Sequence, residues 1–459
     1  MGYLRETGKL TPEVSMRLEN AISMGYQRLL TFEVAGGGFD WFGHAPANVA
    51  LTAYGIMEFH DMARVHTVDH KVIDRAATWL RTQQKQDGSW REPRLPHTLS
   101  VGKGDLALTA FVVWSLAESG MKDDCTRRGV EYLLRNADKA ADPYTLALLS
   151  NALAAWDPKG EARSAVGRLQ PMGTKQGDGL VWQRTGQTLT YGSGTAGDVE
   201  TTALACLSFF DGGGKIDSIN GALSYLVGAK DANGGWHSTQ ATILAMMALL
   251  RQATPSNSGD ARVVVKVNGA EAGVLTVTPD QSDVMQLLDL RPHVTEGENR
   301  VELEVEGGAA MTYQVVGRYF LPWDQVRREE GKAPLDIALS YDRTTLEKDD
   351  TLNATVRVNY NDENPTFMVI VDLGIPPGFA VDPTAFNEAV AKKQIEKYSI
   401  GGRQVTLYLG NIAKGAPFQL QYALKAKYPI RAKTPKSTVY EYYNPDRRAE
   451  AAPIEILVK

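Results

Sequence analysis

The stretch Gly36-Gly37-Gly38-Phe39-Asp40-Trp41 and the phrase Leu51-Thr52-Ala53-Tyr54 that follows it introduce the pattern that decides the fold. Similar glycine–aromatic corners recur as Asp87-Gly88-Ser89-Trp90 and Asn233-Gly234-Gly235-Trp236. The threonine-centred phrase recurs as Leu108-Thr109-Ala110-Phe111, Tyr144-Thr145-Leu146-Ala147, Thr201-Thr202-Ala203-Leu204 and Ala241-Thr242-Ile243-Leu244. A helical unit of this size cannot bury its apolar face alone, so its neighbours must stack on it. The repeats therefore predict a solenoid or a closed ring of helices over residues 12–252.

The apolar residues within these units recur at helical spacing. One face of a predicted helix, which ends at Asp87-Gly88, carries Val72, Ile73, Ala76, Trp79 and Leu80. The repeated threonines are interpreted as small residues that allow close helix packing, each with its hydroxyl bonded to the backbone one turn earlier. The glycine-rich residues 173–197 are predicted to form a surface loop between two helical hairpins.

The composition of the 459 residues is that of an ordinary globular protein, with 43% hydrophobic and 22% charged residues. A net charge of -5 gives no electrostatic reason to expect a nucleic acid or an anionic membrane as partner. The longest apolar stretch, 106–117, is about half as long as a transmembrane span, so a buried helix is predicted there. The amino-terminal residues show no hydrophobic run behind a positive start, and hence no secretory signal.

The sequence contains two cysteines, Cys125 and Cys206, both within predicted helices. They are interpreted as small buried hydrophobic residues rather than as a disulfide or a reactive pair. No Cys/His array with metal-ligand spacing occurs, and the sequence implies neither a metal nor a cofactor.

The character of the sequence changes at residues 255–259, Pro-Ser-Asn-Ser-Gly, and β-strand patterns follow. The Asn268-Gly269 pair between two apolar runs predicts a hairpin. Residues 301–305 alternate in polarity, as expected for a half-buried strand. A polar linker near 329–334 marks a second boundary.

Beyond that linker, apolar residues alternate with polar ones at Leu352, Ala354, Val356 and Val358. A short helix is predicted at 383–393, with Pro383 near its first turn. This pattern predicts a β-sandwich with an inserted helix.

The order of these pieces resembles the C-terminal third of an α-macroglobulin, the family of thioester-containing protease traps and complement components. The matching phrases follow the family's order: Tyr3-Leu4, Thr7-Gly8-Lys9-Leu10-Thr11-Pro12-Glu13, Gly25-Tyr26-Gln27-Arg28, Asp105 to Phe111, Gly234 to Gln240 and Val439 to Asn444. The resemblance covers essentially the whole chain.

The resemblance implies a multidomain fold, in which an α/α toroid precedes two β domains. Residues 1–252 correspond to a thioester-type α/α toroid domain that is truncated at its amino terminus. Residues 260–325 correspond to the second half of a CUB-like β domain. Residues 335–459 correspond to the C-terminal macroglobulin receptor-binding β-sandwich.

The family's chemistry depends on an internal thioester between the cysteine and the glutamine of a Cys-Gly-Glu-Gln-type segment. Cys125 precedes Thr-Arg-Arg and Cys206 precedes Leu-Ser-Phe, so neither cysteine matches that segment. In complement relatives a histidine accepts the acyl group as a nucleophile. His97 is the corresponding acyl-transfer candidate, and a solvent-exposed loop histidine is the alternative interpretation.

The family shields its thioester with tyrosines of the C-terminal domain. The matching residues, and hence the candidates for shielding, are Tyr408, Tyr442 and Tyr443. Aromatic rings exclude water over a large area, although ordinary strand aromatics would look the same in the sequence.

Animal relatives bind a scavenger receptor through two lysines. The corresponding positions are Phe386 and Val390, which does not support that function here. Lys392, Lys393 and Lys397 follow shortly after and are predicted to form a solvated face.

The resemblance implies an α-macroglobulin-like endopeptidase inhibitor, present as a C-terminal fragment and without catalytic turnover. Its expected partners are target proteases, bound through the full-length protein, and domains upstream of Met1. The family implies an extracellular or periplasmic location. The unpaired strand edges of half a CUB-like domain predict that the isolated chain associates.

Two other functions remain open. A non-covalent binding module of the complement-like type would need no thioester. An α/α-toroid enzyme such as a terpene cyclase would need an Asp-rich motif or a zinc-ligand set, and neither is found in the sequence.

Overall fold

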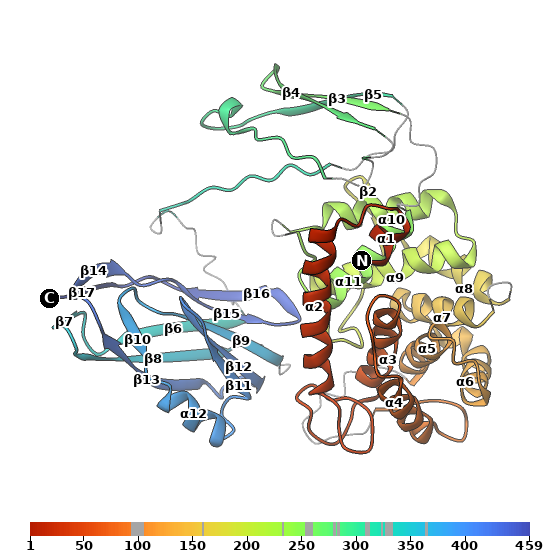
Figure 1. Ribbon diagram of the computed structural model, residues 1–459, viewed down its shortest axis with the longest axis horizontal. Helices are drawn as coiled ribbons and strands as arrows, with labels where there is room; N and C mark the ends of the chain where they lie inside the picture. The colour runs from red at the N-terminus through yellow and green to blue at the C-terminus, as the bar shows by residue number, and fades with distance from the viewer. Residues whose placement is uncertain are drawn as a thin grey trace.

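Helices dominate the chain up to Gln252, and strands dominate after it (Figure 1). This order confirms the predicted fold class, a helical region followed by β-sheet domains. The computed structural model describes residues 1–92, 105–157, 160–231, 234–252, 260–278, 281, 285–307, 313–322, 325, 334–362 and 366–459.

Five long helices form the inside of the helical region, and each contacts the next one in the series. They are α3 (Val49–Ala63), α5 (Asp105–Glu118), α7 (Pro143–Trp156), α9 (Gly194–Gly212) and α11 (Thr239–Gln252). Helix α5 is buried from Leu106 to Ala117, as predicted for the longest apolar stretch. A side-chain hydrogen bond between Tyr54 and Gln240 links the first of these helices to the last.

Four amphipathic helices cover this inner set, one against each of α3, α5, α7 and α9. They are α4 (His70–Gln83), α6 (Asp124–Arg135), α8 (Ala162–Leu169) and α10 (Ile216–Gly228). Asp69 and Asp123 cap the first turns of α4 and α6 with their carboxylates. Helices α1 (Gly2–Glu6) and α2 (Pro12–Leu30) precede them, and Tyr26 of α2 packs edge-on against Phe59 of α3.

The glycine–aromatic corners and the repeated threonines are joined by hydrogen bonds. In four units the threonine hydroxyl of an inner helix accepts from the backbone N–H of an aromatic residue, which belongs to a predicted corner in three units and is Trp182, in an equivalent position, in the fourth. These pairs are Phe39 with Thr52 (2.9 Å), Trp90 with Thr109 (3.0 Å), Trp182 with Thr202 (3.0 Å) and Trp236 with Thr242 (2.9 Å). Thr52 also donates to the carbonyl of Asn48, one turn earlier, as predicted. The two sequence signals therefore belong to one structural unit.

The indole groups of three corner tryptophans tie the outer helices to this unit. Each indole N–H donates to a carbonyl in the last turn of the preceding outer helix. The pairs are Trp90 with Leu80 (2.8 Å), Trp182 with Leu169 (2.8 Å) and Trp236 with Leu226 (2.5 Å). The carbonyls of a last helical turn generally lack an intrahelical donor, so each tryptophan supplies one to a buried acceptor.

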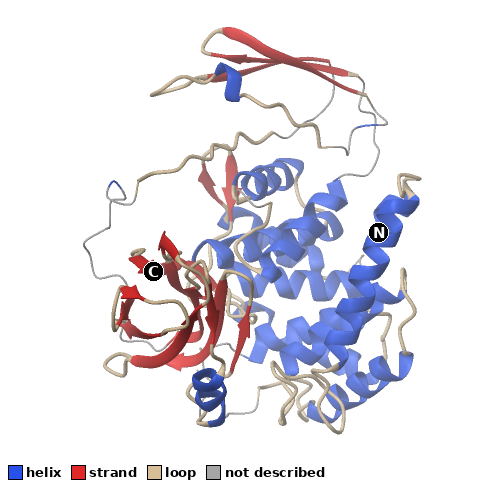
Figure 2. Ribbon diagram, turned by 60° about the vertical axis from the view of Figure 1, so that its left-hand side comes forward, coloured by secondary structure: helices blue, strands red, loops and turns tan. Residues whose placement is uncertain are grey.

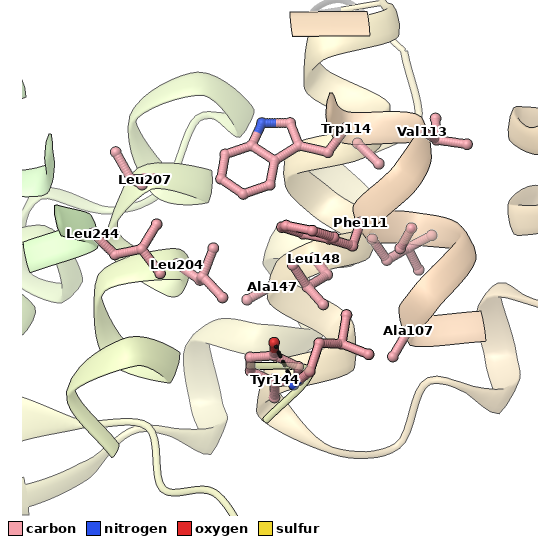
Figure 3. Close-up of a cluster of buried hydrophobic side chains, with 14 of the residues drawn as sticks. Ala107, Phe111, Val113, Trp114, Tyr144, Ala147, Leu148, Leu204, Leu207 and Leu244 are labelled. Carbon is pink, nitrogen blue, oxygen red and sulfur yellow. Dashed lines mark hydrogen bonds between the residues drawn. The ribbon is translucent and has the colours of Figure 1, made fainter. Parts of the chain in front are cut away.

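Apolar side chains fill the space between the inner helices. Figure 3 shows Phe111 and Trp114 of α5 pointing toward Leu148 of α7 and Leu204 of α9. All four are buried, and they belong to one continuous cluster that extends through the whole helical region.

Residues 173–197 are not the surface loop that their glycine content predicts. They contain the hairpin of β1 (Thr174–Gln176) and β2 (Gly179–Val181), followed by the buried Trp182 and Thr188. A Cβ at Gly179 would lie 2.5 Å from the amide nitrogen of Tyr225. Glycine allows a close approach here, and composition alone does not distinguish that use from a loop.

Glu58 of α3 is partly buried, and this desolvation raises its pKa to about 7. The folded state therefore binds more protons than the unfolded state between about pH 4.5 and 7, so stability falls as pH rises through this window. Glu58→Gln is expected to abolish this dependence and to raise the free energy of unfolding at pH 8 by about 1–3 kcal/mol. Urea unfolding at pH 5 and pH 8 measures both effects.

The control for this experiment is Glu13→Gln, because the Glu13 side chain is 70% exposed on α2. It is expected to leave the pH dependence as in the unchanged protein. A Glu58→Gln variant that keeps the original dependence would show that another group is responsible.

A small antiparallel sheet follows the helices, in the order β4-β3-β5. The predicted hairpin is confirmed, with Asn268 and Gly269 both at positive φ in the turn. Its strands are β3 (Ala261–Val267), β4 (Ala270–Val277) and β5 (Val301–Gly307). In Figure 1 this sheet stands apart from the sandwich that follows it.

The last part of the chain is the predicted β-sandwich. One sheet has the order β10-β13-β8-β6, a second β11-β12-β9-β15-β16, and a third β14-β17-β7 with β17 parallel to β7. Leu352, Ala354, Val356 and Val358 all point into the core between the sheets, as their alternation predicts. The strands of the first two sheets are β6 (Leu335–Tyr341), β8 (Thr351–Tyr360), β9 (Thr366–Gly374), β10 (Phe379–Val381), β11 (Lys397–Ile400), β12 (Gln404–Ile412), β13 (Phe418–Ala426), β15 (Ser437–Glu441) and β16 (Asn444–Ala451).

The remaining elements complete the sandwich. They are β7 (Thr345–Leu346), β14 (Ile430–Lys433), β17 (Glu455–Val458) and α12 (Thr384–Ala391). Helix α12 is the predicted inserted helix, with Pro383 at its N-cap, and it contacts β11 and β13. Across the described residues, no helix combines the length and the apolar character needed to cross a membrane.

Candidate functional site

A separate cluster of side chains lies where the sandwich meets the helical region. We call it the aromatic seam, and its members are Trp41, Phe42, Tyr191, Met368, Ile370, Tyr408, Tyr440 and Tyr443. The helical region supplies the first three, and strands of the five-stranded sheet and the turn between β15 and β16 supply the others. Figure 1 shows the β15–β16 hairpin reaching toward the helices.

The tip of this hairpin makes the central contacts of the seam. Because Glu441 pairs with Asn444, the turn consists of Tyr442 and Tyr443. The Tyr443 ring centroid lies 5.8 Å from that of Trp41 and 5.5 Å from that of Tyr191. Burial raises the pKa of the Tyr443 phenol well above its ordinary value, so this ring stays neutral.

A backbone hydrogen bond adds to the aromatic contacts. The amide of Ser193, just before α9, donates to the carbonyl of Tyr443 at 3.3 Å. Helix α9 and strand β16 also contact each other directly. The hairpin tip is therefore docked on the helical region by both rings and backbone.

The first glycine–aromatic corner presents Trp41 and Phe42. The Asp40 carboxylate accepts hydrogen bonds from the amides of Phe42 (3.1 Å) and His44 (3.3 Å) and so fixes the turn. A Cβ at Gly38 would lie 2.8 Å from the Ala47 side chain, so the corner requires glycine there. The seam thus uses a loop that the helical repeat already holds in place.

Tyr408 joins the seam from β12, together with a cation. The Lys397 ammonium lies 4.4 Å from the centroid of the Tyr408 ring and 6.0 Å from that of Phe42. Desolvation, with a smaller effect of Arg28, lowers the pKa of Lys397. Lys397 therefore does not belong to the predicted solvated face, whereas Lys392 is exposed and pairs with Glu388.

Tyr442 occupies a more peripheral position. Its side chain is 37% exposed, and its ring packs perpendicular to Tyr443 with centroids 4.9 Å apart. Of the three predicted tyrosines, Tyr408 and Tyr443 thus lie in the seam, and Tyr442 covers Tyr443 from outside.

A paired buried carboxylate stiffens the hairpin behind its tip. Glu441 lies 3.2 Å from the guanidinium of Arg447 and 3.3 Å from the hydroxyl of Tyr360, at the end of β8. Desolvation raises the pKa of Glu441, and the attraction of Arg447 opposes that rise. The ion pair compensates for burial of the charge and ties the hairpin to the neighbouring sheet.

The residues of the seam from the helical region were not predicted from the sequence. Trp41 belongs to a repeated corner. The sequence of that corner does not distinguish a ring that faces outward from a ring in the core. Tyr191 lies in the segment 173–197, whose glycine content predicts a surface loop. A usable signal is the pair of additional aromatic residues after Phe39, Trp41 and Phe42, which the other corners lack.

The remaining predicted site residue, His97, lies outside the described residues, and its acyl-transfer role stays a prediction. Cys125 and Cys206 are both buried and free, as predicted for small hydrophobic residues. Desolvation raises their pKa values to about 11 and about 12, so neither forms a thiolate readily. Within the described part of the chain, no three His, Cys, Asp or Glu residues are grouped to hold a metal ion.

These features define a class of protein: helical hairpins around a filled centre, with their loops covered by an aromatic hairpin of a C-terminal sandwich. A family model described as the A-macroglobulin TED domain matches residues 1–251, and one described as the A-macroglobulin receptor binding domain matches residues 364–452. The chain therefore belongs to the α-macroglobulin family.

Relatives with this family's names match almost the whole chain. The mouse protein Alpha-2-macroglobulin-like protein 1 is 23% identical over 96% of the chain and 31% of its own length. Chicken Ovostatin is 22% identical over 98% of the chain and 32% of its own length. Thioester-containing protein 1 allele S1 of Anopheles gambiae is 23% identical over 98% of the chain and 33% of its own length. The chain thus spans about a third of the length of these relatives.

Solved structures share the fold. Native alpha-2-macroglobulin from Escherichia coli, from domain MG7 to the C-terminus, matches with a TM-score of 0.68 at 15% identity, over 99% of this chain and 70% of that one. Salmonella alpha-2-macroglobulin reacted with methylamine matches with a TM-score of 0.67 at 16% identity, over 99% of this chain and 28% of that one.

Proposed function

We propose that this chain is the C-terminal part of an α-macroglobulin-like endopeptidase inhibitor and has no catalytic turnover of its own. In this proposal, residues 1–252 are the thioester-type domain, 260–325 the second half of a CUB-like domain, and 335–459 the receptor-binding sandwich. Target proteases are its partners through the full-length protein, in an extracellular or periplasmic location. The match of the chain to a third of its relatives' length supports this assignment.

The observation that carries the proposal is the aromatic seam. Trp41, Tyr191, Tyr408 and Tyr443 bring rings from both parts of the chain to one interface. A thioester is an activated acyl group that survives only where water and amines are excluded. We therefore assign shielding to Tyr408 and Tyr443, with Tyr442 as an outer cover. In this proposal, opening of the seam would expose a thioester that the seam covers.

The covalent step requires residues that this sequence does not contain. Cys125 and Cys206 lack the family's motif, and their burial keeps both thiols protonated. This favours one second candidate, a binding module that acts without covalent capture. The coding sequence upstream of Met1 distinguishes the two.

The first test reads that upstream sequence for a Cys-Gly-Glu-Gln-type segment. If it is encoded, the longer protein is incubated with trypsin, and denaturing electrophoresis is expected to show protease covalently attached to it. Methylamine treatment beforehand should abolish the conjugates. If no such segment is encoded, covalent capture is ruled out and the non-covalent module remains.

The isolated chain is expected to associate in a concentration-dependent manner. The β4-β3-β5 sheet has two outer strands with one neighbour each among the described residues, and Tyr319 and Phe320, which follow it in the chain, are 78% and 102% exposed. Sedimentation velocity across a hundredfold concentration range measures the effect, and Tyr319→Ser with Phe320→Ser should reduce it. A strictly monomeric chain at all concentrations would contradict this expectation.

A further inference from the structure

A buried carboxylate lies beneath the loop that carries Tyr191. Glu200 of α9 is only 2% exposed. It accepts hydrogen bonds from the hydroxyls of Thr188 (3.0 Å), Thr190 (2.9 and 3.0 Å) and Tyr144 (3.3 Å). Three hydroxyl donors thus converge on one carboxylate inside the helical region.

The same groups also bind the backbone of the loop. The amide of Leu189 donates to the Tyr144 hydroxyl (3.0 Å), and the amide of Gly192 donates to the Thr188 hydroxyl (2.9 Å). The amide of Thr188 donates to the carbonyl of Gly192 at 2.8 Å and closes the loop. A Cβ at Gly192 would lie 2.8 Å from the Glu200 carboxylate, so the loop fits tightly over it.

The residue at the tip of this loop adopts an unfavourable backbone conformation. Tyr191 has a φ of 68°, in the left-handed region, which is unfavourable for a residue with a Cβ. Such a conformation persists only where the surrounding structure imposes it. The bonds to Thr188 and Gly192 on either side of Tyr191 supply that constraint.

This conformation places the loop against the hairpin tip. The Tyr191 ring lies 5.5 Å from the Tyr443 ring and 5.6 Å from the Trp41 ring, and Ser193 donates to the Tyr443 carbonyl. Within the loop, Tyr191 and Ser193 contact Tyr443 of the sandwich, and both are adjacent to residues bound by the network.

We propose that Glu200 is a positioning residue for the aromatic seam. Its carboxylate holds residues 188–192 so that Tyr191 and Ser193 receive the β15–β16 hairpin, and loss of this acceptor weakens docking of the sandwich. The proposal rests on the proposed function for the importance of a closed seam, but docking itself is measured independently of any thioester.

The choice of a carboxylate follows from its partners. A Glu side chain offers two oxygen acceptors to these hydroxyls, whereas a Gln side chain offers one oxygen acceptor and one NH₂ donor group. Gln has nearly the same shape, but its amide group would point donors at Thr188 and Thr190. Glu200→Gln therefore removes acceptor capacity while creating almost no cavity.

The matched control lies next to Glu200 in the chain. Thr201 is fully buried in α9, and its hydroxyl donates within the helix, to the carbonyl of Gly197 one turn earlier. Thr201→Val should destabilise α9 without disturbing Tyr191. Any effect that appears in Glu200→Gln and not in Thr201→Val is then an effect on the loop.

Docking is measured by energy transfer between dyes on the full chain. Cysteines introduced at Asp138 in the helical region and Gln419 in the sandwich are both exposed, while the native cysteines are buried and resist labelling. A docked sandwich gives one narrow distance distribution, and a released sandwich gives a broad one. Tyr443→Ala serves as the variant that opens the seam directly.

We expect Glu200→Gln and Thr188→Val to lower the docking equilibrium constant about tenfold, with Thr201→Val unchanged. In the double variant Glu200→Gln with Tyr191→Ala, the second change should add little, because both act through the same ring. Unchanged docking in Glu200→Gln, or fully additive losses, would overturn the proposal. Unchanged docking in Tyr443→Ala would instead overturn the role given to the seam in the proposed function.

Discussion

Replacement of Tyr443 by alanine is expected to release the C-terminal sandwich from the helical region. The ring is only 9% exposed and lies between Trp41 and Tyr191, at the centre of the aromatic seam. Truncation of a central interface aromatic costs about 2–4 kcal/mol, which corresponds to roughly 30- to 1,000-fold in the docking constant. Small-angle scattering should show a larger radius of gyration, and both parts should keep their native circular dichroism.

Tyr442→Ala is the matched control, because it removes the same side chain from the neighbouring position. Tyr442 is 37% exposed and contacts the seam through Tyr443. We expect a loss below about 1 kcal/mol, since rim residues of an interface contribute little. If the two variants opened the molecule equally, the central position of Tyr443 would not matter and the seam would need another explanation.

The two parts of the seam differ in how far they could be predicted. Tyr443 and Tyr408 are predicted from the sequence because they match the tyrosines with which the family shields its thioester. Trp41 and Tyr191 were not found, because their role depends on where a separate sheet docks. That docking is set by contacts between residues far apart in the chain, and neither periodicity nor composition encodes it.

Glu200 shows the same limit at a single residue. It stands in the phrase Asp198-Val199-Glu200-Thr201-Thr202, where a charged side chain on a helix is normally assigned to the surface. Its burial becomes understandable only when Thr188, Thr190 and Tyr144 are seen to surround it. Sequence patterns predicted the outer helices from their periodic apolar residues and α5 from its long apolar run, whereas a polar network leaves no such pattern in the sequence.

The repeated corners carry the opposite case, in which the sequence signal and the structural role coincide. Trp90 is fully buried, its backbone N–H binds the Thr109 hydroxyl, and its indole N–H binds the Leu80 carbonyl. Trp90→Ala is expected to lower the free energy of unfolding of the helical region by about 3–5 kcal/mol. Chemical denaturation followed by far-ultraviolet circular dichroism measures this loss, because the helices dominate that signal.

One further variant separates packing from hydrogen bonding at this corner, and a second one serves as a control. Trp90→Phe keeps most of the ring but leaves the Leu80 carbonyl without its donor, so a smaller loss of about 1–3 kcal/mol is expected. The control is Trp156→Ala, which removes the same side chain as Trp90→Ala but at a half-buried position of α7. It should lower the free energy of unfolding by less than Trp90→Ala does. An equal loss for Trp90→Ala and Trp156→Ala would mean that the corner is not a special support of the helical unit. Trp90 and Trp156 are not members of the aromatic seam. The sandwich should therefore stay docked in each of these variants whose helices remain folded.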